Sequence, residues 1–143
     1  MSGQSIKIFV NLPVTDLKRS RAFFDALGFS FNEQFSDDTA ASMVISEHNY
    51  AMLLTHEKFA QFTPKKIADA HATSEVLTAL LLDSREAVDA MMDAAIANGG
   101  KDFRETQDLG FMYGRAFEDP DGHIWEIFFM DMSQMPQDEG DAA

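Results

Sequence analysis

Cysteine is absent from the 143-residue chain. That absence excludes disulfides, cysteine-ligated zinc, thiol nucleophiles and iron–sulfur clusters. Basic residues are few, with 11 Lys and Arg against 24 Asp and Glu, so the formal net charge is −13. Binding to nucleic acid or to anionic lipid depends on Lys and Arg. We therefore expect neither nucleic acid nor a membrane surface as a partner.

Long apolar runs are also absent, since no segment approaches the roughly 20 residues of a membrane-spanning helix. The first four residues lack the basic and apolar regions of a secretory signal. The hydrophobic share is nevertheless 45%, with 13 Phe and 9 Met, which is enough for a packed core. The length is typical of one domain. We expect a folded, single-domain cytoplasmic protein.

The first half of the chain predicts a βαβββ unit. Residues 6–13 are almost continuously apolar and predict a strand covered on both faces. Thr15 or Asp16 can cap the helix that follows, and Gly28 suits its end. Three further strands are expected over residues 29–35, 41–46 and 50–55.

The second half repeats the order of elements. A strand over residues 75–82 precedes a helix capped by Asp83 or Ser84. The residues Asn98-Gly99-Gly100 end that helix. Strands are then expected over residues 102–107, 111–118 and 123–130, with a strong Asp-Pro-Asp-Gly turn at 119–122.

The predicted domain therefore spans residues 1–131 and consists of two βαβββ modules, at about 6–55 and 75–130. Residues 56–74 are mixed and polar and predict a connection with one or two helical turns. Residues 132–143 form an acidic tail with little to bury, which we expect to be disordered.

Two stretches carry a resemblance to a known family. These are VTDLKRSRAFFDALGF at 14–29 and FEDPDGHIWEIFF at 117–129. Together with the paired βαβββ order, they resemble the vicinal oxygen chelate superfamily, which includes glyoxalase I, bleomycin resistance proteins and type I extradiol dioxygenases. The resemblance implies an α+β fold in which curled mixed sheets enclose a cavity. It also implies a homodimer, and a divalent metal held by His and Glu side chains.

The metal-ligand positions implied by the resemblance fall on Phe9, Leu53, Leu77 and Glu126. Only Glu126 carries a donor, whereas zinc and iron take three or more protein ligands in such sites. We therefore expect no metal cofactor, with a divalent metal kept as the alternative. Of the four histidines, His56 is of most interest, because it follows a strand at the rim where a cavity would open.

Strand alternation places Glu126 and Phe128 on one face, toward the implied cavity. Further ligand-binding candidates are Phe9, Asn11, Leu53 and Leu77. Glu126 is the candidate general base or ligand anchor, with His56 and Tyr113 as assisting catalytic residues. Alternatively, a neighbour such as Tyr113 or Arg115 satisfies the Glu126 carboxylate.

Three functions stay open. The first is metal-independent binding of an apolar or cationic small molecule in an apolar cavity around Glu126. The second is a divalent-metal-dependent lyase, isomerase or dioxygenase-like enzyme; glyoxalase I activity itself is not expected, because three of its four ligand positions are apolar here. The third is a structural or interaction dimer whose cavity is filled by side chains.

Overall fold

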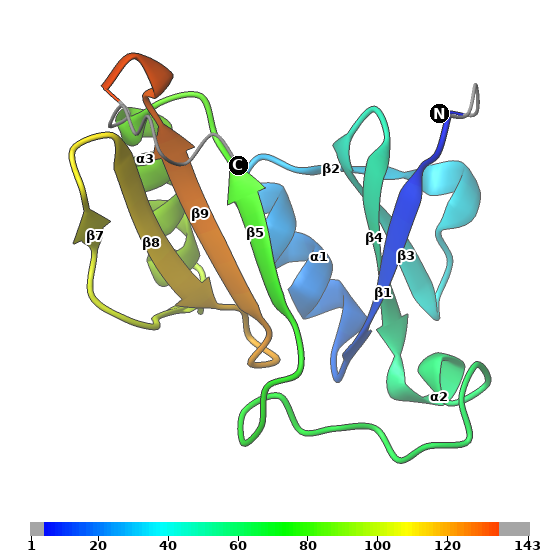
Figure 1. Cartoon of the computed structure of the whole chain (residues 1–143). Helices are drawn as coiled ribbons and strands as arrows, with labels where there is room; N and C mark the ends of the chain where they lie inside the picture. The colour runs from blue at the N-terminus through cyan, green and yellow to red at the C-terminus, as the bar shows by residue number, and fades with distance from the viewer. Residues whose placement is uncertain (1–4, 135–143) are drawn as a thin grey trace, which may run out of the picture.

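The computed structural model describes residues 5–134 and has the α+β architecture expected, with two mixed sheets (Figure 1). The first sheet has the strand order β1-β4-β3-β2. Strand β1 runs parallel to β4, and the other neighbours are antiparallel. The bounds of these strands are Ile8–Val14 for β1, Ser30–Asn32 for β2, Ala40–Ser46 for β3 and Asn49–Thr55 for β4.

The second sheet follows the same plan, with the order β5-β9-β8-β6 and with β7 also paired to β8. Strand β5 is parallel to β9, as β1 is to β4. The prediction of two βαβββ modules is therefore confirmed at the level of topology. The strands are Leu77–Leu81 for β5, Lys101–Asp102 for β6, Gln107–Asp108 for β7, Met112–Glu118 for β8 and Ile124–Met130 for β9.

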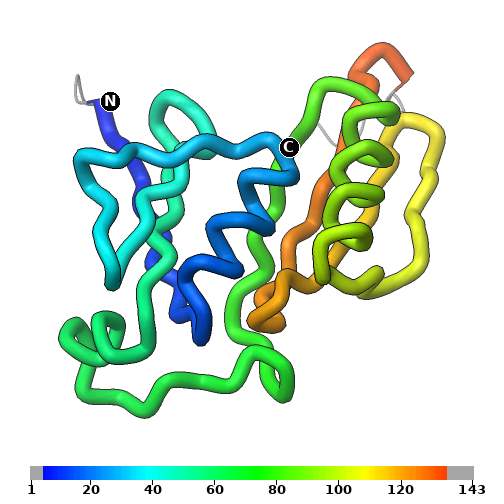
Figure 2. The backbone as a smooth tube through the Cα atoms, turned by 180° about the vertical axis from the view of Figure 1, so that it is seen from behind, coloured from blue at the N-terminus to red at the C-terminus, as the bar shows by residue number. Residues whose placement is uncertain are grey.

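Helices α1 (Leu17–Ala26) and α3 (Arg85–Ala97) lie on the same side of the two sheets, as Figures 1 and 2 show from opposite directions. Their first turns are capped by side chains. Asp16 accepts a hydrogen bond from the amide of Arg19, and Ser84 accepts one from the amide of Ala87. These caps decide between the two candidates that the sequence offered for each helix start.

One hydrophobic core joins the helices to both sheets. Phe23 and Phe24 of α1 are buried at its centre. The ring of Phe24 meets the ring of Trp125 from β9 at 5.2 Å between centroids, and Phe23 lies 5.8 Å from Phe117 of β8. Large buried aromatic side chains dominate the energetics of such a core. Helix α1 of the first module is thus packed against the second module.

The opposite side of each sheet carries no helix, and we call it the open face. On β1 it presents Phe9 and Asn11, both exposed. Asn11 pairs with Met52, whereas Leu53 pairs with Leu12 and is fully buried in the helix-side core. The prediction that Leu53 lines a ligand cavity is therefore wrong, because its strand is apolar on both faces and the expected register was displaced by one residue.

Two expected strands are shorter than predicted. Strand β2 ends at Asn32, whose side chain accepts a hydrogen bond from the amide of Gln34 and starts the 3₁₀ turn η1 (Glu33–Phe35). The strand expected at 102–107 consists of two short pieces, β6 and β7, separated by a loop. That loop places Arg104 over the sheet, as described below.

The last residues that the structure describes differ from the prediction of a disordered tail. Met132–Gln134 forms the 3₁₀ turn η2, in which Asp131 accepts hydrogen bonds from Ser133, so disorder is wrong for these three residues. The rest of the predicted disordered tail, 135–143, lies outside the described residues. Within residues 5–134, no helix is long and apolar enough to cross a membrane.

The connection between the modules begins with α2 (His56–Phe59) and runs below both sheets to β5 (Figure 1). The connection packs closely against the turn before β9. Gly122 has a φ of +87°, and a Cβ built there would lie 2.8 Å from the backbone nitrogen of His71. Only glycine offers both the positive φ and the space at this position.

We predict that Gly122→Ala destabilises the fold more than Gly110→Ala. Both glycines have similar positive φ values, +87° and +85°, so both substitutions carry the left-handed backbone cost of about 1–2 kcal/mol. A Cβ at Gly110 meets nothing within 4 Å, whereas one at Gly122 meets the connection. Urea denaturation of the two variants measures the difference, and equal losses would contradict the close packing.

Candidate functional site

Glu126 lies in the middle of β9, on the open face of the second sheet. Its neighbours across the strands are Ala79 on β5 and Ala116 on β8, both small. Its side chain is 23% exposed, and Arg104 Nη1 donates a hydrogen bond of 2.7 Å to its Oε2. The carboxylate is therefore satisfied by Arg104 and not by Tyr113 or Arg115, the neighbours expected from the sequence.

The backbone explains why Arg104 reaches this carboxylate. The amide of Phe103 donates to the carbonyl of Ala116 at 3.0 Å, and Ala116 is the residue paired with Glu126. The loop from β6 to β7 thus begins beside Glu126, and its first side chains cross the sheet there. The contact of Arg104 with Glu126 could not be predicted from the continuous strand expected over 102–107, because it depends on the loop between β6 and β7.

The ion pair carries unused hydrogen-bonding capacity. Within residues 5–134 neither side chain makes another hydrogen bond, and the buried Nε of Arg104 has no partner. An arginine offers five N–H donors and a carboxylate accepts at both oxygens. The pair therefore presents a donor and an acceptor side by side, with no net charge.

The surface around the ion pair is apolar. Leu77 and Leu81 on β5 are 51% and 62% exposed. Gly114 and Ala116 on β8 are buried and add no bulk, and Phe128 is half-buried beside them. A few polar groups among apolar side chains match the composition of a small-molecule site, but neither Arg104 nor Glu126 lines the cavities of about 390 and 270 Å³ in this structure.

Tyr113 does not belong to this surface. It alternates with Gly114 on β8 and points to the helix side, where its hydroxyl donates to Asp89 Oδ1 of α3 at 2.6 Å. That hydrogen bond, with burial second, raises the pKa of Tyr113 above its ordinary value. Arg115 contacts the same Asp89 at 3.1 Å. The structure therefore separates Tyr113 from Glu126, because the two residues project from opposite faces of the sheet.

His56 is also apart from Glu126. It is exposed at the start of α2 and, with His71 and His123, lines a separate pocket of about 270 Å³ below the sheets. His123 Nε2 donates to the carbonyl of Pro13 at 2.7 Å. No set of three or more His, Asp or Glu side chains in the described part of the chain is arranged to hold a metal ion.

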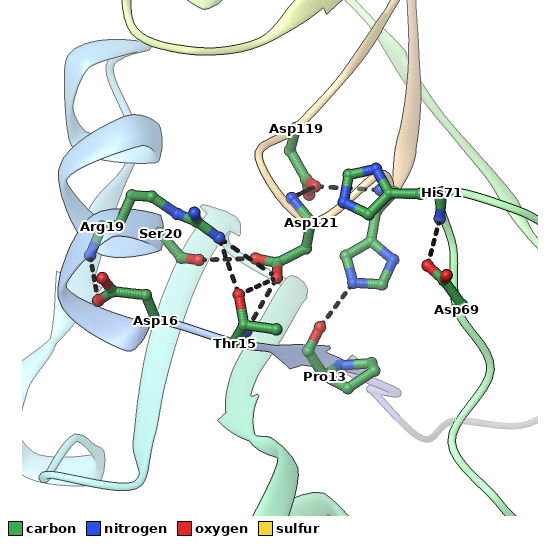
Figure 3. A network of polar contacts seen from close by, with 10 residues as sticks. Pro13, Thr15, Asp16, Arg19, Ser20, Asp69, His71, Asp119 and Asp121 are labelled. Atoms are coloured by element: carbon green, nitrogen blue, oxygen red, sulfur yellow. Dashed lines mark hydrogen bonds and ion pairs between the residues drawn. The ribbon is translucent and has the colours of Figure 1, made fainter.

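Beside this pocket, the Asp-Pro-Asp-Gly turn is tied to the start of α1, as Figure 3 shows. Asp121 Oδ1 accepts hydrogen bonds from the amide and hydroxyl of Thr15 at 2.8 and 2.9 Å, and Oδ2 accepts one from Ser20 at 3.2 Å. Asp121 is buried. Its carboxylate therefore links the second module to the first, and we assign it a structural role.

Asp119 in the same turn is structural too. Its Oδ1 accepts from the amides of Asp121 and His123, and its Oδ2 accepts from Trp125 Nε1 at 3.0 Å. Burial raises the pKa of Asp119 above its ordinary value. These bonds shape the turn that leads into β9, so they fix where Glu126 falls along the strand.

The residues present do not fit the divalent metal that the resemblance implies. The open face offers Phe9 on β1, Met52 on β4 and Leu77 on β5 at or beside the implied positions. None of the three has an oxygen or nitrogen donor in its side chain. The fourth position, Glu126, is already paired with Arg104.

Comparisons with known proteins agree with this fold. The sequence model of the Glyoxalase/Bleomycin resistance protein/Dioxygenase superfamily matches residues 8–127. A hypothetical protein of S. aureus is 26% identical, with a TM-score of 0.76 over 89% of this chain and 95% of that one. A family enzyme from Burkholderia phytofirmans is 21% identical, with a TM-score of 0.70 over 85% and 96%.

A more distant relative in structure is an antibiotic resistance protein. The fosfomycin resistance protein FosX from Mesorhizobium loti is 15% identical, with a TM-score of 0.64 over 94% of this chain and 97% of that one. At this identity the likeness concerns the fold alone. Among curated proteins, no match to this sequence is found.

We predict that Asp121→Ala lowers the free energy of unfolding by about 3 kcal/mol, because the Thr15 amide and the buried Ser20 hydroxyl lose their acceptor. Asp37→Ala is the matched control. Asp37 also accepts three short hydrogen bonds, from Thr39 and Ala40, but it is exposed and its partners lie in its own turn. We expect a loss of about 1 kcal/mol there, and urea denaturation of both variants tests the contrast.

A second prediction concerns metal content. Protein purified without chelator or a His-tag is expected to contain far less than one metal ion per chain by elemental mass spectrometry. Incubation with zinc, nickel, manganese or iron(II) is expected to leave the ratio unchanged, because one ion-paired carboxylate cannot hold these ions. A ratio near one for a single metal would contradict the donor count.

Proposed function

The chain belongs to the Glyoxalase/Bleomycin resistance protein/Dioxygenase superfamily, and on this premise we propose that it binds a small organic molecule on the open face of its second sheet without a divalent metal. The ligand contacts the Arg104–Glu126 pair with its polar end. Its apolar part lies on Leu77, Leu81 and Phe128.

The observation that carries this proposal is the 2.7 Å ion pair itself. In the metal-dependent members to which the sequence is similar, the position of Glu126 supplies a ligand to a Lewis acid. In this chain the carboxylate of Glu126 forms an ion pair with Arg104 instead. The charge balance of the site is thus achieved by protein side chains alone.

The same pair narrows the class of ligand. A lone carboxylate would attract a cation, which was one expectation from the sequence. Because Arg104 neutralises Glu126, a cation gains no net attraction. A neutral hydroxyl or amide suits the pair better, since it can donate to the carboxylate and accept from the guanidinium.

A second copy of the chain would turn this surface into an enclosed cavity. Phe9 on β1 and Leu77 on β5 are each about half exposed on the open faces. Exposed apolar clusters of this kind mark binding or association surfaces. We therefore propose a homodimer in which the open faces are covered, so that a ligand is shielded from water.

Screening a fragment library by two-dimensional amide NMR tests the proposal. Bound neutral fragments are expected to shift the amides of Leu77, Ala79 and Gly114. Arg104→Gln and Glu126→Gln are each expected to weaken binding about tenfold, equivalent to about 1.4 kcal/mol. The double variant should be no weaker than either single one, because the two side chains act as a unit.

Arg21→Gln is the matched control, since Arg21 pairs with Glu33 at the surface of the first module. It should leave fragment binding unchanged. If no fragment shifts the open-face amides, or if the control variant weakens binding as much as Arg104→Gln, the proposed site is wrong.

A further inference from the structure

A cavity of about 390 Å³ lies between the two modules, beneath the connection. Its walls are the end of β1, with Asn11 and Pro13, and the start of β5, with Thr78. The connection covers it from Thr63 to Glu75. Small-molecule sites usually measure about 300–1,000 Å³, so this cavity is large enough for a ligand.

This cavity is separate from the surface around Glu126. Phe9, Leu77 and Glu126 do not line it. Asn11 and Thr78 instead provide polar groups from two edge strands, each of which has only one neighbour in its sheet. The lining of the cavity therefore differs from the surface around Glu126, although Asn11 also belongs to the open face of β1.

Only slightly more than half of the lining surface is apolar, and four hydroxyl side chains lie among the lining residues: Thr63, Thr73, Ser74 and Thr78. The apolar lining includes Phe59 and Ile67 from the connection and Leu12 and Ile124 from the two sheets. Such a lining buries the hydrocarbon part of a ligand, at about 25 cal/mol per Å².

Basic residues outnumber acidic residues in the lining of the cavity, whereas the chain as a whole is acidic. Lys65 and Lys66 line the cavity with Glu75 as the single acidic residue, although the whole chain has a net charge of −13. Among residues 5–134 all ion pairs are made by arginines, and neither lysine has a carboxylate partner. Two lining lysines without a carboxylate partner in the described residues favour an anionic ligand.

The covering segment has weak ties to the body. In the described part of the chain, every hydrogen bond of residues 60–76 has its partner within residues 56–76, as in the turn that Asp69 closes. Side-chain packing and the contact of His71 with Gly122 hold it in place. A segment attached in this way can open locally at low free-energy cost and admit a ligand.

From these observations we infer that the cavity is a second binding site, for a small organic anion with an apolar body. The apolar body lies between Ile67 and Ile124, and the anionic group meets Lys65 and Lys66. Neither Arg104 nor Glu126 lines this site.

Titration with sodium octanoate, followed by two-dimensional amide NMR, tests this inference. Saturable shifts are expected at Lys66, Ala68, Thr78 and His123, with a dissociation constant of about 1 mM or below. The double variant Lys65→Gln/Lys66→Gln should weaken octanoate at least tenfold. Both lysines are exposed, so the variant is expected to keep its fold, which its amide spectrum checks directly.

Three controls make the result specific. Lys18→Gln/Lys101→Gln removes two exposed lysines elsewhere and should leave octanoate affinity unchanged. The neutral analogue 1-octanol should bind equally to the unmodified protein and to Lys65→Gln/Lys66→Gln. Arg104→Gln/Glu126→Gln should not alter octanoate binding, which separates this site from the proposed function.

The inference is overturned if octanoate gives no saturable shifts up to about 10 mM. That concentration is ten times the highest dissociation constant expected, about 1 mM. It is equally overturned if the shifts centre on Gly114 and Glu126, or if both lysine pairs reduce affinity alike. The last outcome would mean nonspecific attraction to positive charge.

Discussion

The packing of Phe23 and Phe24 against both sheets determines the arrangement of the rest of the molecule. These two rings of α1 contact Phe117 and Trp125 of the second module, so one helix belongs to the cores of both. The hydrogen bonds from Thr15 and Ser20 to Asp121 fix the same helix at its start. With the helices confined to one side, the opposite faces of both sheets stay free to bind.

The open face has the family fold, but its side chains differ from those that the family resemblance implies for a metal site. The carboxylate of Glu126 retains the position that the family resemblance implies for a metal ligand, but the facing positions are apolar. Burying an unpaired carboxylate is costly, and Arg104 offsets that cost. In the proposed function, this site recognises a ligand by shape and hydrogen bonding rather than by charge.

The cavity beneath the connection differs from this surface in its electrostatics. Its lysines have no carboxylate partners in the described residues, whereas each arginine of the fold has one. Arginine forms planar, directional pairs that hold loops and helices together, while lysine is a flexible point charge. The paired arginines therefore lie in the body of the fold, whereas the connection carries two lysines without a carboxylate partner among residues 5–134.

Much of the fold could be predicted from the sequence. Helix caps, the Asp-Pro-Asp-Gly turn and the order of apolar segments are local signals, and they determined both modules, the boundaries of most strands and the position of Glu126 on β9. Strand alternation also placed Phe9, Asn11, Leu77 and Phe128 on one side of their strands.

Local sequence patterns did not predict the facing of a strand that is apolar on both faces. They also did not predict a contact between residues far apart in the chain. Strand β4 is apolar on both faces, so nothing local distinguished Leu53 from its neighbours, and its pairing with Leu12 decided the matter. Arg104 lies 22 residues from Glu126, and a break between β6 and β7 brings them together. The sequence by itself determined which elements form. The tertiary structure decided which side chains meet, because those contacts depend on register and on loops that no short-range pattern encodes.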